Sequence, residues 1–278
     1  MREYDVATGT AVITGAASGI GEQLAHSLAR RGSALVLVDR DAERLARVAD
    51  AVGPLTARPV TTHVVDLADD AATHALGETL VREHADATLL VNNAGVALGG
   101  SFEEVSEEEF DWLMAINFRA VVTLTRALLP VLRANPGAHL VNVSSLFGLI
   151  APAGQTAYAT SKFAVRGFTE ALRAELAGRV GVTVVHPGGI RTRIAQTARV
   201  AAAAPADQAA AGKADFDRLL TFPPERAAEL IVAAVQHRRP RLLIGMSAVV
   251  PDLLARAAPA HYPALLTGFQ RLTARGQR

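Results

Sequence analysis

The chain has 278 residues, half of them hydrophobic, and its 28 basic and 27 acidic residues leave a net charge of +1. A balance this even gives no reason to expect a nucleic-acid partner or binding to an anionic membrane. Cysteine is absent, which excludes disulfides and thiolate metal sites, and we predict no metal. Residues 1–5 lack an apolar signal core, and the apolar stretch 242–251 is too short to span a bilayer, so we expect a soluble cytoplasmic protein.

Apolar runs and helical repeats alternate along the chain. Strands are expected at 11–14, 34–38, 60–65, 88–91, 139–143, 182–185 and 241–245, and helices at 20–31, 41–51, 71–84, 107–132, 156–176 and 223–237. Ser106 and Glu109 form a capping box that opens the 107–132 helix. The alanine-rich stretch 201–211 is interpreted as a helix or a mobile lid. This alternation predicts one α/β domain with a doubly wound parallel sheet of about seven strands and helices on both faces.

A glycine-rich turn follows the first strand, in the order Thr14-Gly15-Ala16-Ala17-Ser18-Gly19-Ile20-Gly21. In this strand–turn–helix context, backbone N–H groups at the helix N-terminus can bind the pyrophosphate of a dinucleotide. Gly15 would permit the tight turn, while Gly19 and Gly21 would remove side chains that block the ligand. Asp39 ends the second strand, 18 residues after Gly21, where an acid accepts the adenosine ribose hydroxyls. The alternative is that Asp39 caps the helix that begins near residue 41.

A second group of residues combines a hydroxyl, a phenol and an ammonium. Tyr158 and Lys162 are four residues apart and therefore share one face of the 156–176 helix. Ser145 stands thirteen residues before Tyr158, and the loop 151–154 lets the chain fold back so that the three side chains can meet. A free tyrosine has a pKa of about 10, which is too high for a general base near neutral pH. We expect the ammonium of Lys162 to lower that pKa.

The spacing Ser145-x12-Tyr158-x3-Lys162, together with the G-x-x-x-G-x-G turn, resembles the short-chain dehydrogenase/reductase (SDR) family. The resemblance implies a Rossmann-like fold and an NAD(P)-dependent oxidoreductase that interconverts a secondary alcohol and a ketone. It implies that Tyr158 is the general acid/base, that Lys162 lowers its pKa and binds the nicotinamide ribose, and that Ser145 hydrogen-bonds the substrate oxygen. Asn117 would perturb its helix and hold a water that contacts the lysine.

The resemblance also assigns several turns to the cofactor. The turn 92–95 would lie against the cofactor, Asp66 and Leu67 would meet the adenine, and 187–192 would contact the nicotinamide carboxamide and the phosphates. The predicted cofactor-binding residues are Gly15, Ser18, Gly19, Ile20, Gly21, Asp39, Arg40, Asp66, Leu67, Asn93, Ala94, Gly95, Tyr158, Lys162, Pro187, Gly188, Ile190 and Thr192. All these turns follow strands, so they should gather at the carboxyl edge of the sheet. His186 is interpreted as a strand-end residue.

Cofactor and substrate preferences follow from a few side chains. The carboxylate of Asp39 favours NAD, because it would repel the 2′-phosphate of NADP. Arg40 can instead pair with that phosphate, so NADP remains possible. Leu146, Phe147, Ile150 and Gly189 are predicted to form the substrate pocket, which suits an apolar alcohol or ketone. The identity of the substrate and the direction of the reaction are left open.

Two other classes of function use the same fold. One is a non-catalytic nucleotide-binding regulator, and the other is an isomerase, dehydratase or epimerase. A regulator would need none of the residues Ser145, Tyr158, Lys162 and Asn117. A serine hydrolase is not supported, because neither Ser18 nor Ser145 stands in a G-x-S-x-G motif.

The C-terminus continues past the last predicted strand. We divide the chain into a nucleotide-binding catalytic domain, 1–245, and a helical extension, 246–278, packed on the same domain or on a neighbouring subunit. In the extension Tyr262, Leu265, Leu266, Phe269 and Leu272 form one apolar stripe at helical spacing, which we expect to cover the mouth of the pocket. Relatives commonly pair helices such as 107–132 and 156–176 across a two-fold axis, which implies a homodimer or homotetramer.

Overall fold

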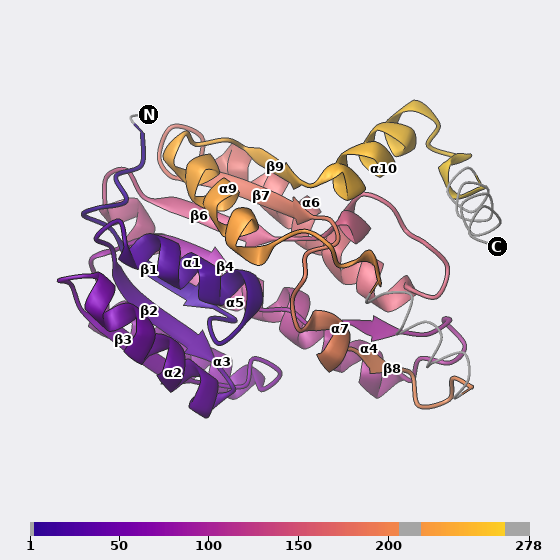
Figure 1. The fold of residues 1–278 in the computed structure, drawn as a ribbon, viewed down its shortest axis with the longest axis horizontal. Coiled ribbons are helices and arrows are strands. Elements are labelled where there is room, and N and C mark those ends of the chain that lie inside the picture. Colours follow the sequence, from indigo (N-terminus) through magenta and orange to yellow (C-terminus); the bar gives the residue numbers. More distant parts are fainter. Residues whose placement is uncertain (1–2, 206–217, 265–278) are drawn as a thin grey trace.

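A computed structural model describes residues 3–205 and 218–264 (Figure 1). At its centre is a parallel sheet of seven strands in the order β3-β2-β1-β4-β6-β7-β9. Its strands are β1 Thr10–Thr14, β2 Ala34–Asp39, β3 Val60–Val64, β4 Ala87–Asn92, β6 His139–Val143, β7 Gly181–Pro187 and β9 Arg241–Ile244. The strand order runs outward from β1 on one side and from β4 on the other, so the predicted doubly wound sheet is confirmed.

Three helices cover each face of the sheet (Figure 1). One face carries α1 Gly19–Ala29, α2 Ala42–Val52 and α9 Pro224–Gln236, and the other carries α3 Asp70–Glu83, α5 Ala120–Ala134 and α6 Thr156–Glu175. Side chains alternate along each strand, so Ile13 and Leu37 enter the first core while Val12 and Val36 enter the second. This two-sided burial explains why the central strands are continuous apolar runs.

The helix expected at 107–132 contains a wider turn. It consists of α4 Glu107–Met114, a π-helical turn Ala115–Arg119 and then α5. The capping box is confirmed, because Glu109 N donates to Ser106 Oγ at 3.2 Å and Ser106 N donates to Glu109 Oε2 at 3.0 Å. Within the described ranges, Glu107–Ala134 is long and apolar enough to cross a membrane by length and composition alone, but 56% of its most apolar window is buried inside the protein. That burial is typical of a core helix.

Several short elements were not predicted. The two-residue strands β5 Leu98–Gly99 and β8 Arg199–Val200 pair beside α4 and α7 Ile194–Thr197, away from the main sheet (Figure 1). Such short segments have no periodicity that a sequence pattern can reveal. The 3₁₀ turns Gly53–Leu55 and Leu146–Gly148 are equally short. Of the alanine-rich stretch, residues 201–205 form no helix, and 206–211 lie outside the described residues.

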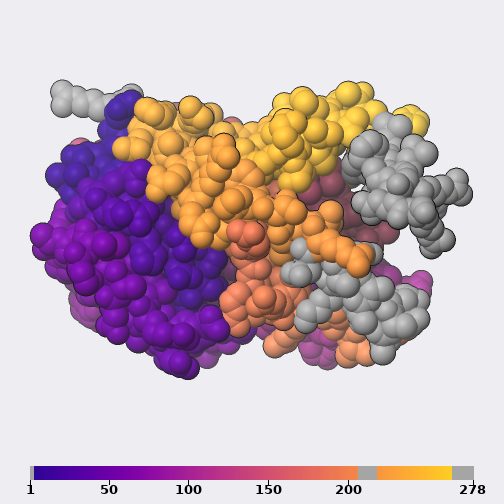
Figure 2. Space-filling view, in the orientation of Figure 1, coloured from indigo at the N-terminus to yellow at the C-terminus, as the bar shows by residue number. Residues whose placement is uncertain are grey.

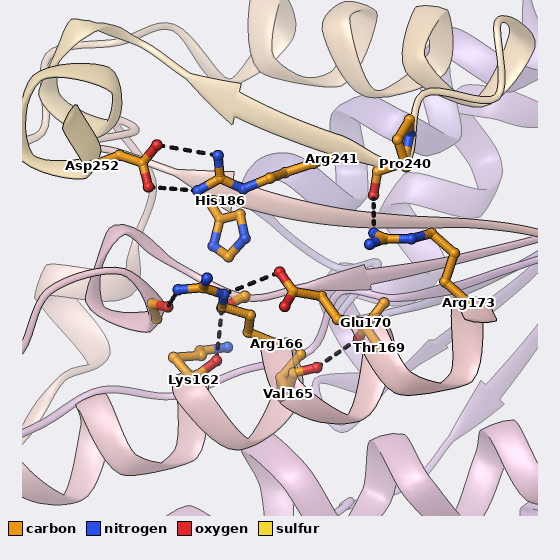
Figure 3. A network of polar contacts seen from close by, with 12 residues as sticks. Lys162, Val165, Arg166, Thr169, Glu170, Arg173, His186, Pro240, Arg241 and Asp252 are labelled. Atoms are coloured by element: carbon orange, nitrogen blue, oxygen red, sulfur yellow. Dashed lines mark hydrogen bonds and ion pairs between the residues drawn. The ribbon is translucent and has the colours of Figure 1, made fainter. Parts of the chain in front are cut away.

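The described part of the C-terminal extension begins with a helix, α10 Met246–Ala257. The sequence pattern did not indicate a helix at these residues, because Pro251, which disfavours a helix interior, stands inside it. In the space-filling view α9 and α10, in orange and yellow, run along the same edge of the molecule (Figure 2). Asp252 fastens α10 to β9 by accepting hydrogen bonds from Arg241 Nη1 at 3.1 Å and Nη2 at 2.5 Å (Figure 3). Leu265, Leu266, Phe269 and Leu272 of the predicted stripe lie outside the described residues.

Candidate active site

A cleft of about 1280 Å³ opens at the carboxyl ends of the strands. A pocket for one small molecule measures about 300–1,000 Å³, so this cleft has room for a dinucleotide together with a substrate. Every predicted site residue lines it except Gly21 and Asn117. The lining residues predicted from the sequence are Gly15, Ser18, Gly19, Ile20, Asp39, Arg40, Asp66, Leu67, Asn93, Ala94, Gly95, Ser145, Leu146, Phe147, Ile150, Tyr158, Lys162, Pro187, Gly188, Gly189, Ile190 and Thr192.

The glycine-rich turn after β1 has no space for side chains. Gly15 and Gly19 adopt φ angles of +67° and +58°, which disfavour other residues. A Cβ on Gly15 would lie 2.8 Å from Ala94 Cα, and one on Gly19 would lie 2.9 Å from Thr192 Cγ2. A Cβ on Gly21 would lie 2.0 Å from the Gly15 carbonyl oxygen, so Gly21 permits packing within the turn. The prediction that Gly21 clears space for the ligand stays untested, while the turn as a whole fits a pyrophosphate.

The residues at the end of β2 lie beside this turn. Asp39 Oδ2 accepts a hydrogen bond from Ala17 N at 3.0 Å, and its Oδ1 accepts one from Asp41 N at 3.1 Å. Asp41 itself caps α2, because its side chain accepts from Arg44 N at 3.1 Å. The alternative in which Asp39 is the cap is thus excluded. The guanidinium of Arg40 lies 3.9 Å from Asp66 Oδ2, with both side chains half-exposed.

The predicted cluster on α6 assembles at the other end of the cleft. Tyr158 and Lys162 are both buried and both line the cleft. Lys162 Nζ donates to the Val143 carbonyl at 3.3 Å and lies 5.8 Å from the centroid of the Tyr158 ring. Ser145 Oγ accepts from Phe147 N at 3.1 Å, and its side chain lies near enough to Tyr158 to lower the pKa of the phenol. The hydroxyl, the phenol and the ammonium therefore converge as the spacing predicts.

Burial dominates the electrostatics of this cluster. It raises the pKa of Tyr158, and the hydrogen bond with Ser145 offsets that effect only in part. Burial also lowers the pKa of Lys162 to about 8. The net pKa of Tyr158 is set mainly by burial, and the expectation that Lys162 lowers it stays a prediction. At neutral pH Tyr158 is a phenol and can donate a proton.

Asn117 lies at the π-helical turn beneath the cleft. Its Oδ1 accepts from Val96 N at 2.8 Å, and its Nδ2 donates to the Val96 carbonyl at 3.0 Å and to Ser161 Oγ at 3.1 Å. A Cβ on Gly95 would lie 3.1 Å from Lys162 Nζ and 3.3 Å from Asn117 Oδ1. Asn117 and Lys162 thus face each other across Gly95. The perturbed helix expected at Asn117 is present, and the water relay stays a prediction.

A buried polar network supports the cluster from behind (Figure 3). His186, at the end of β7, is fully buried, and its Nδ1 lies 3.0 Å from the Ser145 carbonyl oxygen. Burial lowers the pKa of His186 to about 4, so the ring is neutral and its Nδ1–H donates to that carbonyl. Ser144 Oγ donates to the Lys162 carbonyl at 2.8 Å, and Arg166 Nη1 donates to the Gly148 carbonyl at 3.2 Å. No sequence pattern indicated that His186 would bind the backbone carbonyl of Ser145.

More residues line the substrate end of the cleft than the four that the sequence predicted. Leu146, Phe147, Ile150 and Gly189 line it, as expected. Further lining residues include Ile194, Leu219, Leu220, Ser247, Pro251, Tyr262, Pro263 and Ala264. Tyr262 Oη accepts a hydrogen bond from Ala151 N at 3.0 Å. The extension therefore reaches the loop that joins Ser145 to Tyr158, and the apolar stripe beginning at Tyr262 was the sequence signal for it.

Comparison with known proteins agrees with this geometry. The family model of the short chain dehydrogenases matches residues 9–202. A Mycobacterium tuberculosis protein described as an oxidoreductase, SadH, is 40% identical over 269 residues, which cover 96% of this chain and 94% of that protein.

Two solved structures share the fold over nearly the whole chain. An SDR from Burkholderia phymatum in complex with NAD superposes with a TM-score of 0.84 at 30% identity and covers 91% of this chain and 95% of its own. A short-chain dehydrogenase from Sphingobium yanoikuyae in complex with NADPH gives a TM-score of 0.74 at 27% identity, with 96% of each chain covered. Sequence and architecture together establish that this chain belongs to the short-chain dehydrogenase/reductase family, as an oxidoreductase that binds NAD(P).

Proposed function

We propose that the protein interconverts a secondary alcohol and a ketone. The observation that carries this proposal is the convergence of Ser145, Tyr158 and Lys162 in a cleft large enough for a dinucleotide and a substrate. The dinucleotide, when bound, supplies or accepts the hydride. The turn after β1 would hold its pyrophosphate, Asp39 its adenosine ribose and Lys162 its nicotinamide ribose.

The protein's own side chains handle the oxygen and the proton. Because Ser145 and Tyr158 line the same end of the cleft and interact with each other, a substrate oxygen placed against both would receive two hydrogen bonds. Ser145 stabilises the charge that develops on that oxygen, and Tyr158 donates the proton in reduction or takes it in oxidation. The raised pKa of Tyr158 favours ketone reduction near neutral pH. Lys162 and Asn117, facing each other across Gly95, would pass the replacement proton from solvent.

The rival classes gain no support from the site. A non-catalytic regulator has no use for a buried lysine and a buried tyrosine beside a serine hydroxyl, since burying ionisable groups costs stability. An isomerase or dehydratase would need a further acid or base beside Tyr158. Ser145 and the apolar residues Leu146 and Phe147 supply none.

We propose NAD as the preferred cofactor. Asp39 lines the cleft beside the glycine-rich turn, and a 2′-phosphate about 4 Å from its carboxylate would be repelled by several kcal/mol at an effective dielectric constant of ~20. The guanidinium of Arg40 is turned toward Asp66, so it does not offset this repulsion. That ion pair is half-exposed and weak, which leaves NADP as the secondary cofactor.

We further propose that the extension 246–278 is a lid over an apolar substrate site. The support is that Ser247, Pro251 and residues 262–264 of the extension line the cleft, and that Tyr262 is hydrogen-bonded to Ala151. We place the enzyme in the cytoplasm as a homodimer or homotetramer formed through the 107–134 and 156–175 helices. Light scattering at micromolar concentration tests the assembly, and a monomer mass would contradict it.

The proton-transfer role predicts the behaviour of two variants. Tyr158→Phe should lower kcat by at least about 10²-fold, because it removes the acid/base, while NADH affinity stays within about twofold. Lys162→Ala should lower both kcat and NADH affinity. Steady-state kinetics with a panel of ketones and NADH fluorescence titration measure the two effects. A Tyr158→Phe enzyme that keeps most of its activity would show that another group moves the proton.

The raised pKa of Tyr158 predicts opposite pH profiles for the two directions. Oxidation needs the phenolate, so its kcat/KM should climb with pH through the alkaline range. Reduction needs the phenol, so its kcat/KM should stay level at neutral pH and fall only above the raised pKa. Ser145→Ala removes the hydrogen bond that lowers the pKa, so its oxidation profile should shift further to alkaline pH. An oxidation profile that is already flat at pH ~7 would contradict the assignment.

Two substitutions that each remove one carboxylate, at Asp39 or at Asp66, test the choice of cofactor. The native enzyme should have a kcat/KM for NAD at least about tenfold above that for NADP. Asp39→Asn should lose most of this preference. Asp66→Asn is the matched control, because it removes a nearby carboxylate that does not face the ribose, and its smaller effect reports the release of Arg40. A native preference for NADP would mean that Arg40 turns inward.

The lid predicts an effect confined to the substrate. Tyr262→Phe removes only the bond to Ala151, and it should raise KM for bulky apolar ketones severalfold while KM for NAD stays unchanged. The neighbouring His261→Ala, whose side chain is exposed, is the control. Deleting 260–278 should enlarge the effect. Full activity and an unchanged oligomer mass after that deletion would exclude both a lid and an interface role.

A further inference from the structure

A second cluster of titratable side chains lies away from the cleft, between an edge strand and the end of a helix. His63 is on β3, the outermost strand of the sheet, and Glu83 and His84 end α3. One nitrogen of each imidazole and one carboxylate oxygen of Glu83 all lie within 4.8 Å of one another. The two imidazole rings meet edge to face, with centroids 5.9 Å apart. None of the three residues lines the cleft.

The Nε2 atoms of both histidines are unsatisfied. Each is buried and has no hydrogen-bond partner among the described residues. A buried polar atom without a partner costs about 1–3 kcal/mol, so two such atoms in one cluster call for an explanation. Thr61, two residues before His63 and therefore on the same side of β3, has a buried and unpartnered Oγ1 as well. The polar atoms on this side of the strand lack a shared partner.

The chemistry of the cluster identifies that partner as a cation. The buried Nε2 atoms of His63 and His84 lack hydrogen-bond partners among the described residues, and an imidazole nitrogen can offer a lone pair to a metal ion. Two imidazoles and a carboxylate are ligands that divalent zinc, cobalt and nickel accept. A hydrogen-bonding small molecule would require donors for both imidazole lone pairs, whereas one metal ion satisfies both.

We propose that His63, Glu83 and His84 bind one divalent transition-metal ion of the zinc, cobalt and nickel class. Metal–ligand bonds of about 2.0–2.2 Å require donor atoms roughly 3.3 Å apart, which side-chain rotation within the present 4.8 Å can achieve. Water would fill the remaining positions. The ion would link the edge strand β3 to the end of α3, and this proposal departs from the sequence-based prediction of no metal site.

Arg82 is the competing charge. Its Nη2 lies 2.8 Å from Glu83 Oε1, and both side chains are largely exposed. An exposed ion pair contributes at most about 1 kcal/mol, so a divalent ion can displace the guanidinium. The exposure of Glu83 also gives the ion a path from solvent. Removing the charge of Arg82 should therefore tighten metal binding.

The test uses full-length, tag-free protein freed of metal with a chelator. Co²⁺ titration, followed by its visible absorption, should show one ion per chain, and Zn²⁺ should raise Tm by several degrees. Glu83→Gln and His84→Gln should each weaken Co²⁺ binding at least about tenfold, and Arg82→Ala should strengthen it. His74→Ala is the control, because His74 is an exposed histidine on the same helix, 3.8 Å from Asp70.

Two results would overturn the proposal. One is the absence of Co²⁺ absorption and of a Zn²⁺-dependent Tm shift in the native protein. The other is binding that His74→Ala weakens and that Glu83→Gln and His84→Gln leave intact, which would place the ion elsewhere. Because Glu83 is exposed, the Glu83→Gln variant should fold normally. The test therefore stays decisive even if a histidine variant unfolds. Turnover with NADH should not depend on the metal, which separates this proposal from the proposed function.

Discussion

The close approach of two turns, after β1 and after β4, is the contact on which the site depends. Thr14 Oγ1 receives hydrogen bonds from Asn93 N and Ala94 N, each at 3.0 Å, and Asn93 Nδ2 donates to the carbonyls of Thr14 and Gly15 at 3.0 and 3.2 Å. The strand order reverses between β1 and β4, and this is where open α/β sheets bind ligands. The contact leaves no room for a Cβ on Gly15. Because glycine has no side chain, the two turns can approach each other while the backbone of the first turn faces the cleft.

The end of the cleft that holds Ser145, Tyr158 and Lys162 destabilises the fold, because two ionisable side chains are buried there. Tyr158 and Lys162 are buried, and a buried ionisable group is tolerated where neighbouring groups hold it in place. Asn117 and His186 supply that support by binding, respectively, the helix that carries Tyr158 and the carbonyl of Ser145. Loss of such a support would move the hydroxyl and the phenol apart, so we expect these buried polar residues to influence turnover without touching the substrate.

The two halves of the chain contribute to different sides of the cleft. The N-terminal half builds the nucleotide side of the cleft from turns that follow β1, β2 and β4. Under the proposed function, the C-terminal half builds the substrate side and also contributes Lys162 and the turn 187–192 to the nucleotide. On the substrate side Asp252 holds α10 in place, and the following segment reaches Ala151 through Tyr262. Differences in specificity among members of one fold family arise in such added segments, while the sheet and its turns stay the same. The proposed metal site lies outside the cleft and would act on stability alone.

The sequence alone determined the seven strands, the six long helices and about half of the residues that line the cleft, because periodicity and motif spacing are local properties that one chain carries in order. It left open whatever depends on the approach of distant residues. Only the tertiary structure decided that Gly21 packs against Gly15, that burial raises the pKa of Tyr158, and that His186 lies behind Ser145. The meeting of His63 and His84 is of the same kind. Desolvation and contact depend on which segments meet, and no spacing along the chain specifies that.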